Sequence, residues 1–494
     1  MKNDLNFFKT EIISGLLWKF AERIGAQAIT FILSIILARL LSPSDYGVIA
    51  ILLVFITIAD VFVNAGFGSA LIQKKDADNL DFSSVFYFSF IFSVFVYLVV
   101  FLSAPFVANF YNMPILQTTL QVLALRIPVA AINSVQQAYV SRNMQFKKFF
   151  YSTLSGTAAS AVVGIFMAYN GYGIWSLVGQ YLSNAVINTI VLFSVISWRP
   201  QLIFSFQRLK SLFSYGWKLL LSGLLDTGYQ SLNSLLIGKF YTSADLAFFD
   251  TGKKFPMVIV TNINSSISSV LFPALASEQD EPERVKAHTR KAIQISSYIM
   301  WPMMLGMAAC ADSIVSLVLT DKWLPAVPYL QIACITYGLW PIHTANLQAI
   351  NAMGHSDIFL KLEIIKKVIG ITALFISIQY GVLAIALSGI ITGIVSTFIN
   401  AYPNGYLLKY SYLEQLKDIL PSFLYAAIMS LIVYFLSNEF MKNIYLKLLL
   451  QIFIGVCVYI LFSYIFKSRS LKYLINNIFN RKDEFHAKNN RERI

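Results

Sequence analysis

The chain has 494 residues, of which 57% are hydrophobic and only 13% are charged. A soluble domain averages about 25% charged residues, so this composition excludes an ordinary water-soluble protein and predicts one embedded in lipid. A net charge of +13 is also typical of nucleic-acid binders. Here, however, the basic residues lie beside the ends of apolar segments, which the positive-inside rule explains without a nucleic acid.

Fourteen apolar segments follow one another, each close to the roughly 20 residues that a helix needs to cross the hydrocarbon. They cover about residues 14–39, 46–72, 83–109, 115–138, 149–169, 173–196, 214–238, 247–275, 292–319, 327–353, 362–379, 382–404, 417–437 and 444–466. Most Lys and Arg residues fall on alternate connections between these segments. Because cytoplasmic loops keep Lys and Arg, the pattern predicts a multi-pass membrane protein with both termini in the cytoplasm. The first segment carries charges and lacks a small-residue cleavage pattern, so we expect a retained span.

The two halves of the chain resemble each other at an interval of about 200 residues. The matches are colinear: Trp18-Lys19 with Trp217-Lys218, 39–45 with 239–245, Asn64 with Asn264, and 69–71 with 269–271. Six spans per half is an even number, so both halves enter the membrane in the same direction, as in two-lobed transporters. The predicted fold is therefore all-α, a polytopic membrane protein with 14 transmembrane helices in two parallel-repeat six-helix lobes plus two extra C-terminal helices.

This repeat also divides the chain into predicted parts. They are an N-terminal six-helix lobe (1–199), a cytoplasmic interfacial linker (200–213), a C-terminal six-helix lobe (214–409), transmembrane helices 13 and 14 (410–466) and a basic cytoplasmic tail (467–494). In the tail, Leu471, Leu474, Ile475, Ile478 and Phe479 have helical spacing beside basic residues. An amphipathic helix on anionic lipid and a solvated tail fit this pattern about equally well.

Charged residues inside the spans point to the substrate, because each one costs several kcal/mol unless it is paired or hydrated. Lys19 and Arg23 share one face of the first span with Gln27, Thr30 and Ser34. In the seventh span, Lys218 and Asp226 share a face with Ser222, Tyr229 and Asn233. Two such faces at equivalent repeat positions predict that the first helix of each lobe lines a shared aqueous cavity.

The remaining intramembrane charges leave alternatives open. Lys19, Lys218, Lys253 and Lys254 could instead snorkel to the nearer interface, and Glu22 is expected to pair with Lys19 or Arg23. Asp60 and Arg126 lie too near the middle of their spans to snorkel easily. They either pair with each other as a lock between spans of one lobe or line the cavity, where Asp60 or Asp226 would carry a coupling proton or sodium ion.

Basic residues outnumber acidic ones within the spans, which favours an anionic substrate. Arg suits bidentate phosphate contacts, and Lys acts as a point charge. The candidate substrate-binding residues are Lys19, Arg23, Arg126, Lys218, Lys253 and Lys254, and the candidate ion-coupling residues are Asp60 and Asp226.

Motifs of common catalytic sites are missing from the sequence. No Walker A sequence or G-x-S-x-G elbow occurs, and the four histidines are scattered. The three cysteines lie within apolar segments without metal or disulfide spacing. We therefore expect no catalytic residue, cofactor or metal, and a transporter rather than an enzyme. A membrane glycosyltransferase or ligase is the alternative from another class, and the absence of long loops and of a carboxylate cluster disfavours it.

Four sequence stretches resemble a known family. They are Arg39-Leu-Leu-Ser-Pro-Ser-Asp-Tyr-Gly47, Asn64-Ala-Gly-Phe-Gly-Ser-Ala-Leu-Ile-Gln73, Arg142-Asn-Met-Gln-Phe-Lys147 and Gly171-Tyr-Gly-Ile-Trp-Ser-Leu-Val-Gly-Gln180. With the fourteen spans and the duplicated lobe, the chain is similar to the polysaccharide transporter family. This is the Wzx-type oligosaccharide flippase branch of the multidrug/oligosaccharidyl-lipid/polysaccharide exporter superfamily.

The resemblance implies a specific function. Such proteins move undecaprenyl-diphosphate-linked oligosaccharide from the cytoplasmic to the periplasmic leaflet of the bacterial inner membrane, for assembly of O-antigen, capsule or exopolysaccharide. Alternating access through a cationic central cavity, coupled to H⁺ or Na⁺, is implied. Membrane lipids, a polysaccharide polymerase and chain-length proteins are expected partners of a monomer. A lipid II flippase and a cation-coupled multidrug exporter of the same fold remain alternatives; the excess of basic residues disfavours the exporter.

Overall fold

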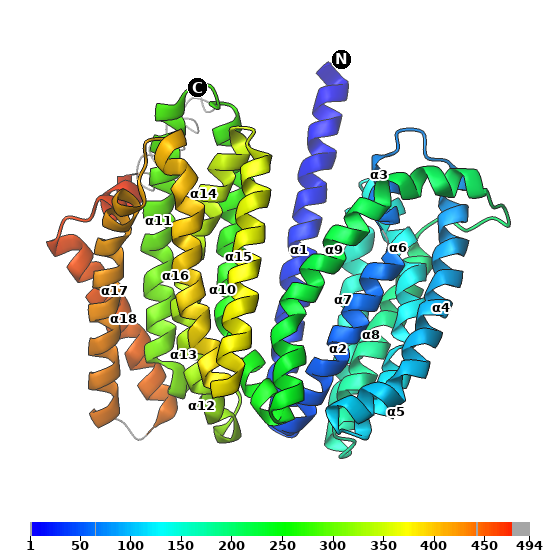
Figure 1. Cartoon of the computed structure of the whole chain (residues 1–494), viewed down its shortest axis with the longest axis horizontal. Coiled ribbons are helices and arrows are strands. Elements are labelled where there is room, and N and C mark those ends of the chain that lie inside the picture. Colours follow the sequence, from blue (N-terminus) through cyan, green and yellow to red (C-terminus); the bar gives the residue numbers. More distant parts are fainter. Residues whose placement is uncertain (1, 65, 441–442, 477–494) are drawn as a thin grey trace, which may run out of the picture. The chain divides into compact units, whose positions relative to one another are not determined.

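The computed structural model describes residues 2–64, 66–440 and 443–476. Every regular element in this part of the chain is a helix, so the predicted all-α fold is confirmed. The chain divides into two compact units, residues 1–247 and 248–494. Figure 1 shows that the long helices within each unit run side by side.

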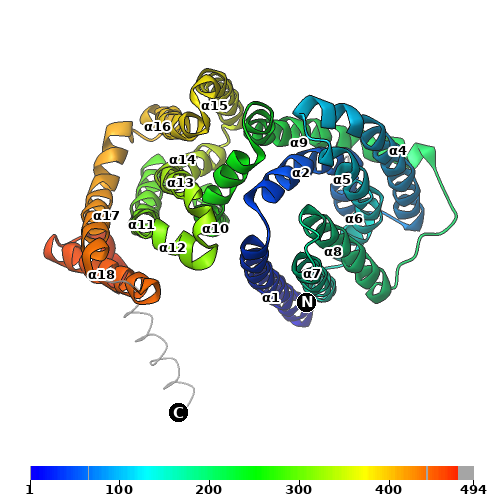
Figure 2. The same cartoon turned by 90° about the horizontal axis from the view of Figure 1, so that it is seen from below.

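The first unit contains a helical hairpin at residues 146–195 and a long helix at residues 206–240, which crosses the predicted lobe boundary. Its helices are α1 (Lys2–Leu40), α2 (Pro43–Asn64), α3 (Phe67–Gln73), α4 (Asn79–Tyr111), α5 (Ile115–Leu123), α6 (Arg126–Arg142), α7 (Phe146–Tyr169), α8 (Ile174–Val195), α9 (Phe206–Phe240) and the start of α10 (Ser243–Ala276). Helix α7 packs between α1 and α8 (Figure 2). The turn from α7 to α8 uses Gly171 and Gly173 at φ 78° and 53°, where a side chain would be strained.

Helix α9 packs closely on α2, although the sequence repeat assigns it to the second half. A Cβ added at Gly238 would lie 2.8 Å from Cδ1 of Ile51, and one at Gly223 would lie 3.2 Å from Cγ1 of Val61. Small residues allow helices to approach at these points. The compact first unit therefore extends through α9, whereas the predicted lobe boundaries at 199 and 214 follow the repeat and stay a prediction.

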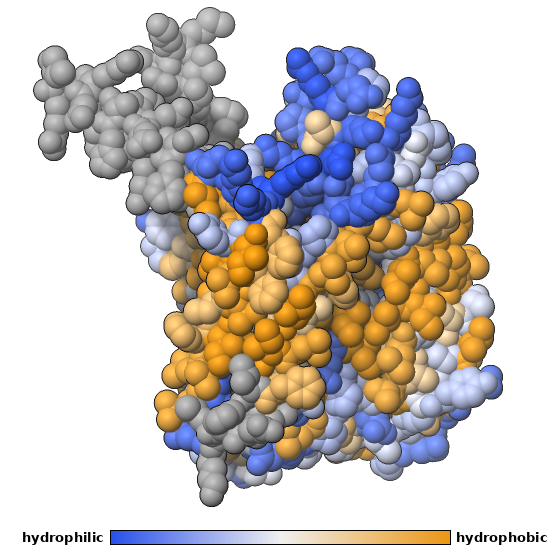
Figure 3. All heavy atoms as spheres, turned by 90° about the vertical axis from the view of Figure 1, so that its left-hand side faces the viewer, coloured by the Kyte–Doolittle hydropathy of each residue, from blue (hydrophilic) through white to orange (hydrophobic). Residues whose placement is uncertain are grey.

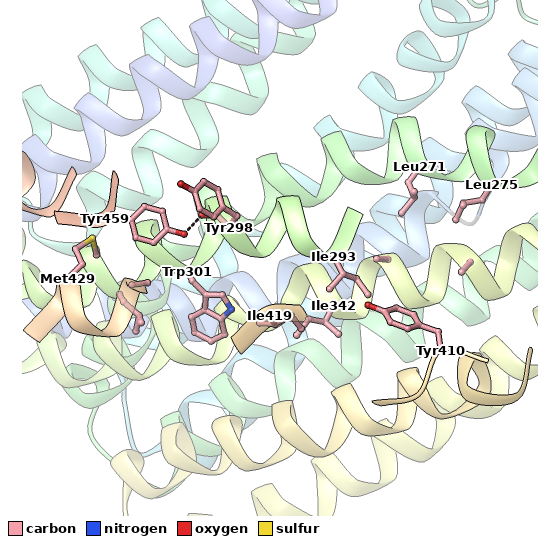
Figure 4. Close-up of a cluster of buried hydrophobic side chains, with 14 of the residues drawn as sticks. Leu271, Leu275, Ile293, Tyr298, Trp301, Ile342, Tyr410, Ile419, Met429 and Tyr459 are labelled. Carbon is pink, nitrogen blue, oxygen red and sulfur yellow. Dashed lines mark hydrogen bonds between the residues drawn. The ribbon is translucent and has the colours of Figure 1, made fainter. Parts of the chain in front are cut away.

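The second unit contains the rest of α10 and the helices that follow. They are α11 (Pro282–Ala309), α12 (Ala311–Val318), η1 (Asp321–Ala326), α13 (Val327–Gly338), α14 (Trp340–Ala352), α15 (Ser356–Ser377), η2 (Ile378–Tyr380), α16 (Val382–Leu407), α17 (Tyr412–Phe440) and α18 (Ile444–Ile465). An apolar cluster of this unit joins α11 to α17 and α18 (Figure 4). Trp301 packs edge-on against Phe423 at 4.8 Å between ring centroids, and the Tyr459 hydroxyl donates to the Tyr298 carbonyl at 2.8 Å.

The starts of α2 and α10, at positions related by the sequence repeat, have the same local structure. The Ser42 hydroxyl donates to the Asp45 carboxylate at 2.6 Å, and the Asp45 N–H donates back to the Ser42 hydroxyl at 3.2 Å. At the start of α10, Thr242 and Asp245 make the same two bonds at 2.6 and 3.1 Å. These reciprocal caps satisfy otherwise unpaired groups at the helix ends, and they match the predicted correspondence of 39–45 with 239–245.

The fourth predicted span of each half is broken, and a proline explains each break. Pro128 has no N–H for the carbonyl of Ala124, which instead accepts a tighter bond from the Ile127 N–H at 2.8 Å. Helix α6 therefore begins anew after α5. In the second unit, Pro341 is the second residue of α14, directly after the break at Leu339 between α13 and α14.

Ten helical segments of the described residues are long and apolar enough to span a membrane, or eleven if the bent pair α11–α12 is one span. Figure 3 shows an apolar band on one face between hydrophilic ends. The protein is thus a multi-pass membrane protein. Three of the fourteen predicted spans are not among these eleven segments: they correspond to α9, α15 and the broken α13–α14 pair. Polar residues on α9 and five charges within residues 357–367 of α15 reduce the apolar character of these two helices.

The predicted linker is partly helical. Residues 206–213 form the first two turns of α9, which curves in Figure 1. The preceding extended segment lies on α4, because the backbone N–H groups of Gln201 and Ser205 donate to the hydroxyls of Ser83 and Ser84 at 3.0 and 2.9 Å.

The start of the predicted tail packs on the second unit. Leu471 and Leu474 contact its apolar cluster, within a helix that reaches the last described residue, 476. Ile478 and Phe479 lie outside the described residues.

Candidate functional site

An ion pair joins α2 and α6 of the first unit. Arg126 is the first residue of α6, directly after the break, and its Nη2 lies 3.4 Å from Oδ2 of Asp60. The side chains of Arg126 and Asp60 are 29% and 20% exposed. Oδ1 of Asp60 is buried without a hydrogen-bond partner in the described residues. Since an unpaired charge in a span is costly, each group stabilises the other. The structure thus has the pairing that the sequence left as one of two alternatives.

Lys19 is largely neutralised by its neighbours on α1 and α7. Its ammonium lies 2.7 Å from the Glu22 carboxylate and 4.7 Å from the centre of the Phe149 ring. The Thr153 hydroxyl donates to the other oxygen of Glu22 at 2.9 Å. Glu22 itself is 9% exposed, so it needs these partners. The predicted Lys19–Glu22 pair is present, and its contacts tie α1 to α7.

Two other predicted cations have no partner in the described residues and are therefore available to bind a ligand. Arg23 on α1 and Lys218 on α9 are exposed and make no hydrogen bond or ion pair with the described residues. An exposed charge within a span is tolerated only where water or a charged ligand reaches it. On α9, the exposed carboxylate of Asp226 accepts a 2.7 Å hydrogen bond from Gln230. Of the predicted site residues, Arg23 and Lys218 therefore have the environment best suited to an anionic ligand.

The last two predicted cations belong to the second unit. Lys253 is half-buried, and its ammonium lies 4.3 Å from the centre of the Phe249 ring. Lys254 is exposed on the next position of α10. A cation over an aromatic face is stabilised without losing its charge, so Lys253 can still bind an anion.

Sequence reasoning missed a charged clamp at the ends of α3, α4, α6 and α9. The Arg142 guanidinium donates to the carbonyls of Leu71, Lys74 and Lys75, the first and last at 2.7 Å. Asp81 is fully buried and accepts from Lys74 at 2.6 Å. These basic residues were interpreted only as signals of topology, but they also hold the loop between α3 and α4 in place.

Asp78 caps α4 within the same clamp. Its carboxylate accepts from the Asp81 N–H at 2.9 Å, and Arg208 lies 3.6 Å away. The backbone hydrogen bond, and to a lesser extent the Arg208 charge, lower the pKa of Asp78. The spacing Asp78-x-x-Asp81 before an apolar run was the available signal, since it resembles a capping box.

Each unit also contains a buried amide contact between equivalent helices. In the first unit, the Asn133 amide donates to Thr189 at 2.9 Å, which links α6 to α8. In the second, Asn400 lies 3.0 Å from Nδ1 of His343, which links α16 to α14. Isolated polar residues in apolar stretches were the signal. Among the described residues, no group of three His, Cys, Asp or Glu could hold a metal ion.

Comparison with known proteins identifies the family. Residues 36–328 match the family model described as polysaccharide biosynthesis protein, which covers more than half of the chain. The chain belongs to this family. The family resemblance predicted from the four motifs is thereby confirmed.

Named relatives match most of the chain. The teichuronic acid biosynthesis protein TuaB of Bacillus subtilis is 22% identical over 459 residues, 91% of this chain and 94% of that protein. The lipopolysaccharide biosynthesis protein WzxC of Escherichia coli is 22% identical over 397 residues, 80% of this chain and 81% of that protein. The succinoglycan biosynthesis transport protein ExoT of Rhizobium meliloti is 23% identical and covers 71% of each chain.

Solved structures share the fold at lower identity. The lipid II flippase MurJ in an inward closed conformation matches with a TM-score of 0.72 and 18% identity, over 91% of this chain and 98% of that one. An inward-facing multidrug resistance transporter of the MATE family matches with a TM-score of 0.61 and 14% identity, over 78% and 96%. This polysaccharide biosynthesis family member therefore has the fold of these transporters.

Proposed function

We propose that the protein is a flippase that moves undecaprenyl-diphosphate-linked oligosaccharide from the cytoplasmic to the periplasmic leaflet of the bacterial inner membrane. The product would enter O-antigen, capsule or exopolysaccharide assembly. Family membership supports the pathway, and the names of relatives such as ExoT support transport. In this proposal the protein acts as a monomer with both termini in the cytoplasm.

The observation that carries the proposal is the pair of exposed cations on α1 and α9, which lie in the first and seventh spans predicted from the sequence. Arg23 on α1 and Lys218 on α9 make no hydrogen bond or ion pair with the described residues. A diphosphate offers several oxygens, so a guanidinium can bind it in a bidentate manner and an ammonium can add a point charge. Cationic drugs would be repelled by the same residues.

A two-state mechanism follows from the cost of moving the head group. A diphosphate dragged through hydrocarbon without partners faces a prohibitive desolvation cost, whereas the isoprenoid tail can stay in lipid. Lobes that expose the cations alternately to each side would replace the lost hydration. Lys253 and Lys254 would serve as the cations of the second unit in this scheme.

Asp60 is the proposed coupling residue, with Asp226 as the second candidate. Protonation of Asp60 would remove the negative charge 3.4 Å from Arg126 and release the guanidinium to bind a phosphate. Loss of the proton would restore the ion pair and release the phosphate. The unpartnered Oδ1 of Asp60 is where a proton or a sodium ion would bind in this scheme.

Deletion of the gene in its host tests the proposal. Lipid-linked oligosaccharides are measured by mass spectrometry with leaflet-specific labelling. We expect complete repeat units to accumulate in the cytoplasmic leaflet and the surface polymer to disappear. Normal surface polymer without accumulation would refute the proposal, whereas accumulation of lipid II would support the alternative that shares the MurJ fold.

Variants of the exposed cations test the site. Arg23→Gln and Lys218→Gln should each reduce rescue of surface polymer in the deletion strain by about tenfold or more, on the order of one lost charge-assisted hydrogen bond. Arg23→Lys should retain part of the activity. Lys75→Gln is the matched control, because Lys75 is exposed in a loop and predicted to face the cytoplasm. Equal rescue by the control and the site variants would remove Arg23 and Lys218 from the site.

A further inference from the structure

A groove lies where α1 meets the turn between α6 and α7. It has a volume of about 790 Å³ and is lined by Trp18, Asn143, Lys147, Lys148, Tyr151 and the end of α8 at Val195. All these elements belong to the first unit, and Figure 2 shows α1, α7 and α8 side by side. None of the predicted substrate-binding or ion-coupling residues lines this groove.

The charge of the groove is positive and uncompensated. Among the side chains that the structure describes, no acidic one lines the groove. Lys147 lies over two aromatic rings, 5.2 Å from the centre of Trp18 and 5.8 Å from that of Tyr151. Lys148 makes no hydrogen bond or ion pair with the described residues. Neighbouring Arg142 differs, because backbone carbonyls occupy its guanidinium. Two ammonium groups are therefore left to bind an anion.

The groove lies at the level of the lipid head groups. Trp18 is the second residue of one candidate span, Leu17–Leu40, and Lys147 is the second residue of another, Phe146–Tyr169. Both span ends are on the side that the loop charges predict to be cytoplasmic. Trp and Tyr favour the interface between lipid and water, and lysines beside it attract anionic lipids of the cytoplasmic leaflet.

Helix α1 also exposes an apolar surface near the start of its candidate span, on a different side of the helix from Gly15 and Trp18. Leu17, Phe20 and Ile24 are 64%, 65% and 51% exposed, and their spacing places them on one side of the helix.

We propose that the groove binds the phosphate head group of an anionic phospholipid in the cytoplasmic leaflet. The two lysines contact the phosphate, and the Trp18 and Tyr151 rings hold Lys147 in place and cover the glycerol. The lipid would tie α1 to α7 in addition to the Lys19–Glu22–Thr153 contacts. This site is separate from the proposed transport site, so its test does not depend on transport.

The test uses purified full-length protein in neutral detergent. Binding of dioleoyl-phosphatidylglycerol is titrated by native mass spectrometry, with dioleoyl-phosphatidylcholine and inorganic phosphate as comparison ligands. A lysine near an anionic lipid contributes about fivefold in affinity, so the double variant Lys147→Ala/Lys148→Ala should bind the first phosphatidylglycerol about thirtyfold more weakly. Lys147→Arg/Lys148→Arg should bind it within a few-fold of the wild type.

The control removes the same charge elsewhere on the same side of the first unit. Lys75 and Lys210 are exposed and lie outside the groove, so Lys75→Ala/Lys210→Ala should leave binding within about twofold of the wild type. Melting temperatures without lipid establish that each variant folds. The proposal would be overturned if both double variants lost the same amount of phosphatidylglycerol affinity, or if neither lost any. It would also be overturned if the wild type bound phosphatidylcholine equally well, or if inorganic phosphate displaced the bound phosphatidylglycerol.

Discussion

The Asp60–Arg126 ion pair allows a quantitative test of the structure. We consider Asp60→Asn, Arg126→Gln and the double variant. Either single variant leaves one charge without its partner inside the first unit. The double variant removes both charges and keeps the shapes of the side chains approximately. The double variant should therefore be less destabilised than the sum of the two single variants.

The expected coupling energy follows from distance and exposure. At 3.4 Å, with an effective dielectric constant of about 20, Coulomb's law gives 332/(20 × 3.4), or about 5 kcal/mol, before desolvation. Removing one partner of a buried pair costs about 3–5 kcal/mol, whereas a surface pair contributes about 1 kcal/mol or less. With the side chains 29% and 20% exposed, we expect about 2–3 kcal/mol for each single variant and a coupling of about 1–2 kcal/mol.

The free energy of unfolding is measured by denaturant titration in mixed micelles for the four proteins of the cycle. Lys361 and Asp357 provide a matched control pair at 3.6 Å, with side chains 73% and 65% exposed. Their coupling should be about 0.5 kcal/mol or less. A coupling between Asp60 and Arg126 no larger than that of the control pair would refute the reasoning. Normal transport by Asp60→Asn would separately exclude Asp60 as the coupling residue.

Three further predictions concern stability. Gly47→Ala would place its Cβ against the Ser243 carbonyl and 2.8 Å from the Ser243 Cα, which should cost about 3 kcal/mol or more in unfolding titrations; Gly228→Ala, with open space around it, should cost nothing. Asp78→Ala should lose about 1 kcal/mol of capping energy. Folding lowers the pKa of Asp78 from 3.8. The difference in unfolding free energy between the wild type and Asp78→Ala should therefore be complete at neutral pH and shrink as the pH falls below about 4. A difference that does not change with pH would contradict the role of the Asp78 carboxylate as the cap of α4. Trp323→Ala, at a fully buried position, should cost about 3–5 kcal/mol, against less than about 1 kcal/mol for exposed Leu324→Ala.

The sequence by itself determined the class of the fold and the family. Apolar segments of membrane-spanning length can only be helices, because backbone groups in lipid must bond within their own segment. The repeat was visible because Ser42–Asp45 and Thr242–Asp245 are local caps, whose bonds span only three residues. The breaks before Pro128 and Pro341 also have a local cause, since a missing N–H acts within one turn, although the predicted spans 115–138 and 327–353 ran through both.

The tertiary structure decided which charges are paired. Lys19 and Lys218 occupy equivalent repeat positions, yet only Lys19 has a carboxylate partner, Glu22, in the described residues. Asp60 and Arg126 are 66 positions apart in the chain, and no helical periodicity relates residues on different helices. The packing of α2 against α6 brings them together. Ion pairing depends on distances of a few ångströms between side chains on different helices, and packing alone sets these distances.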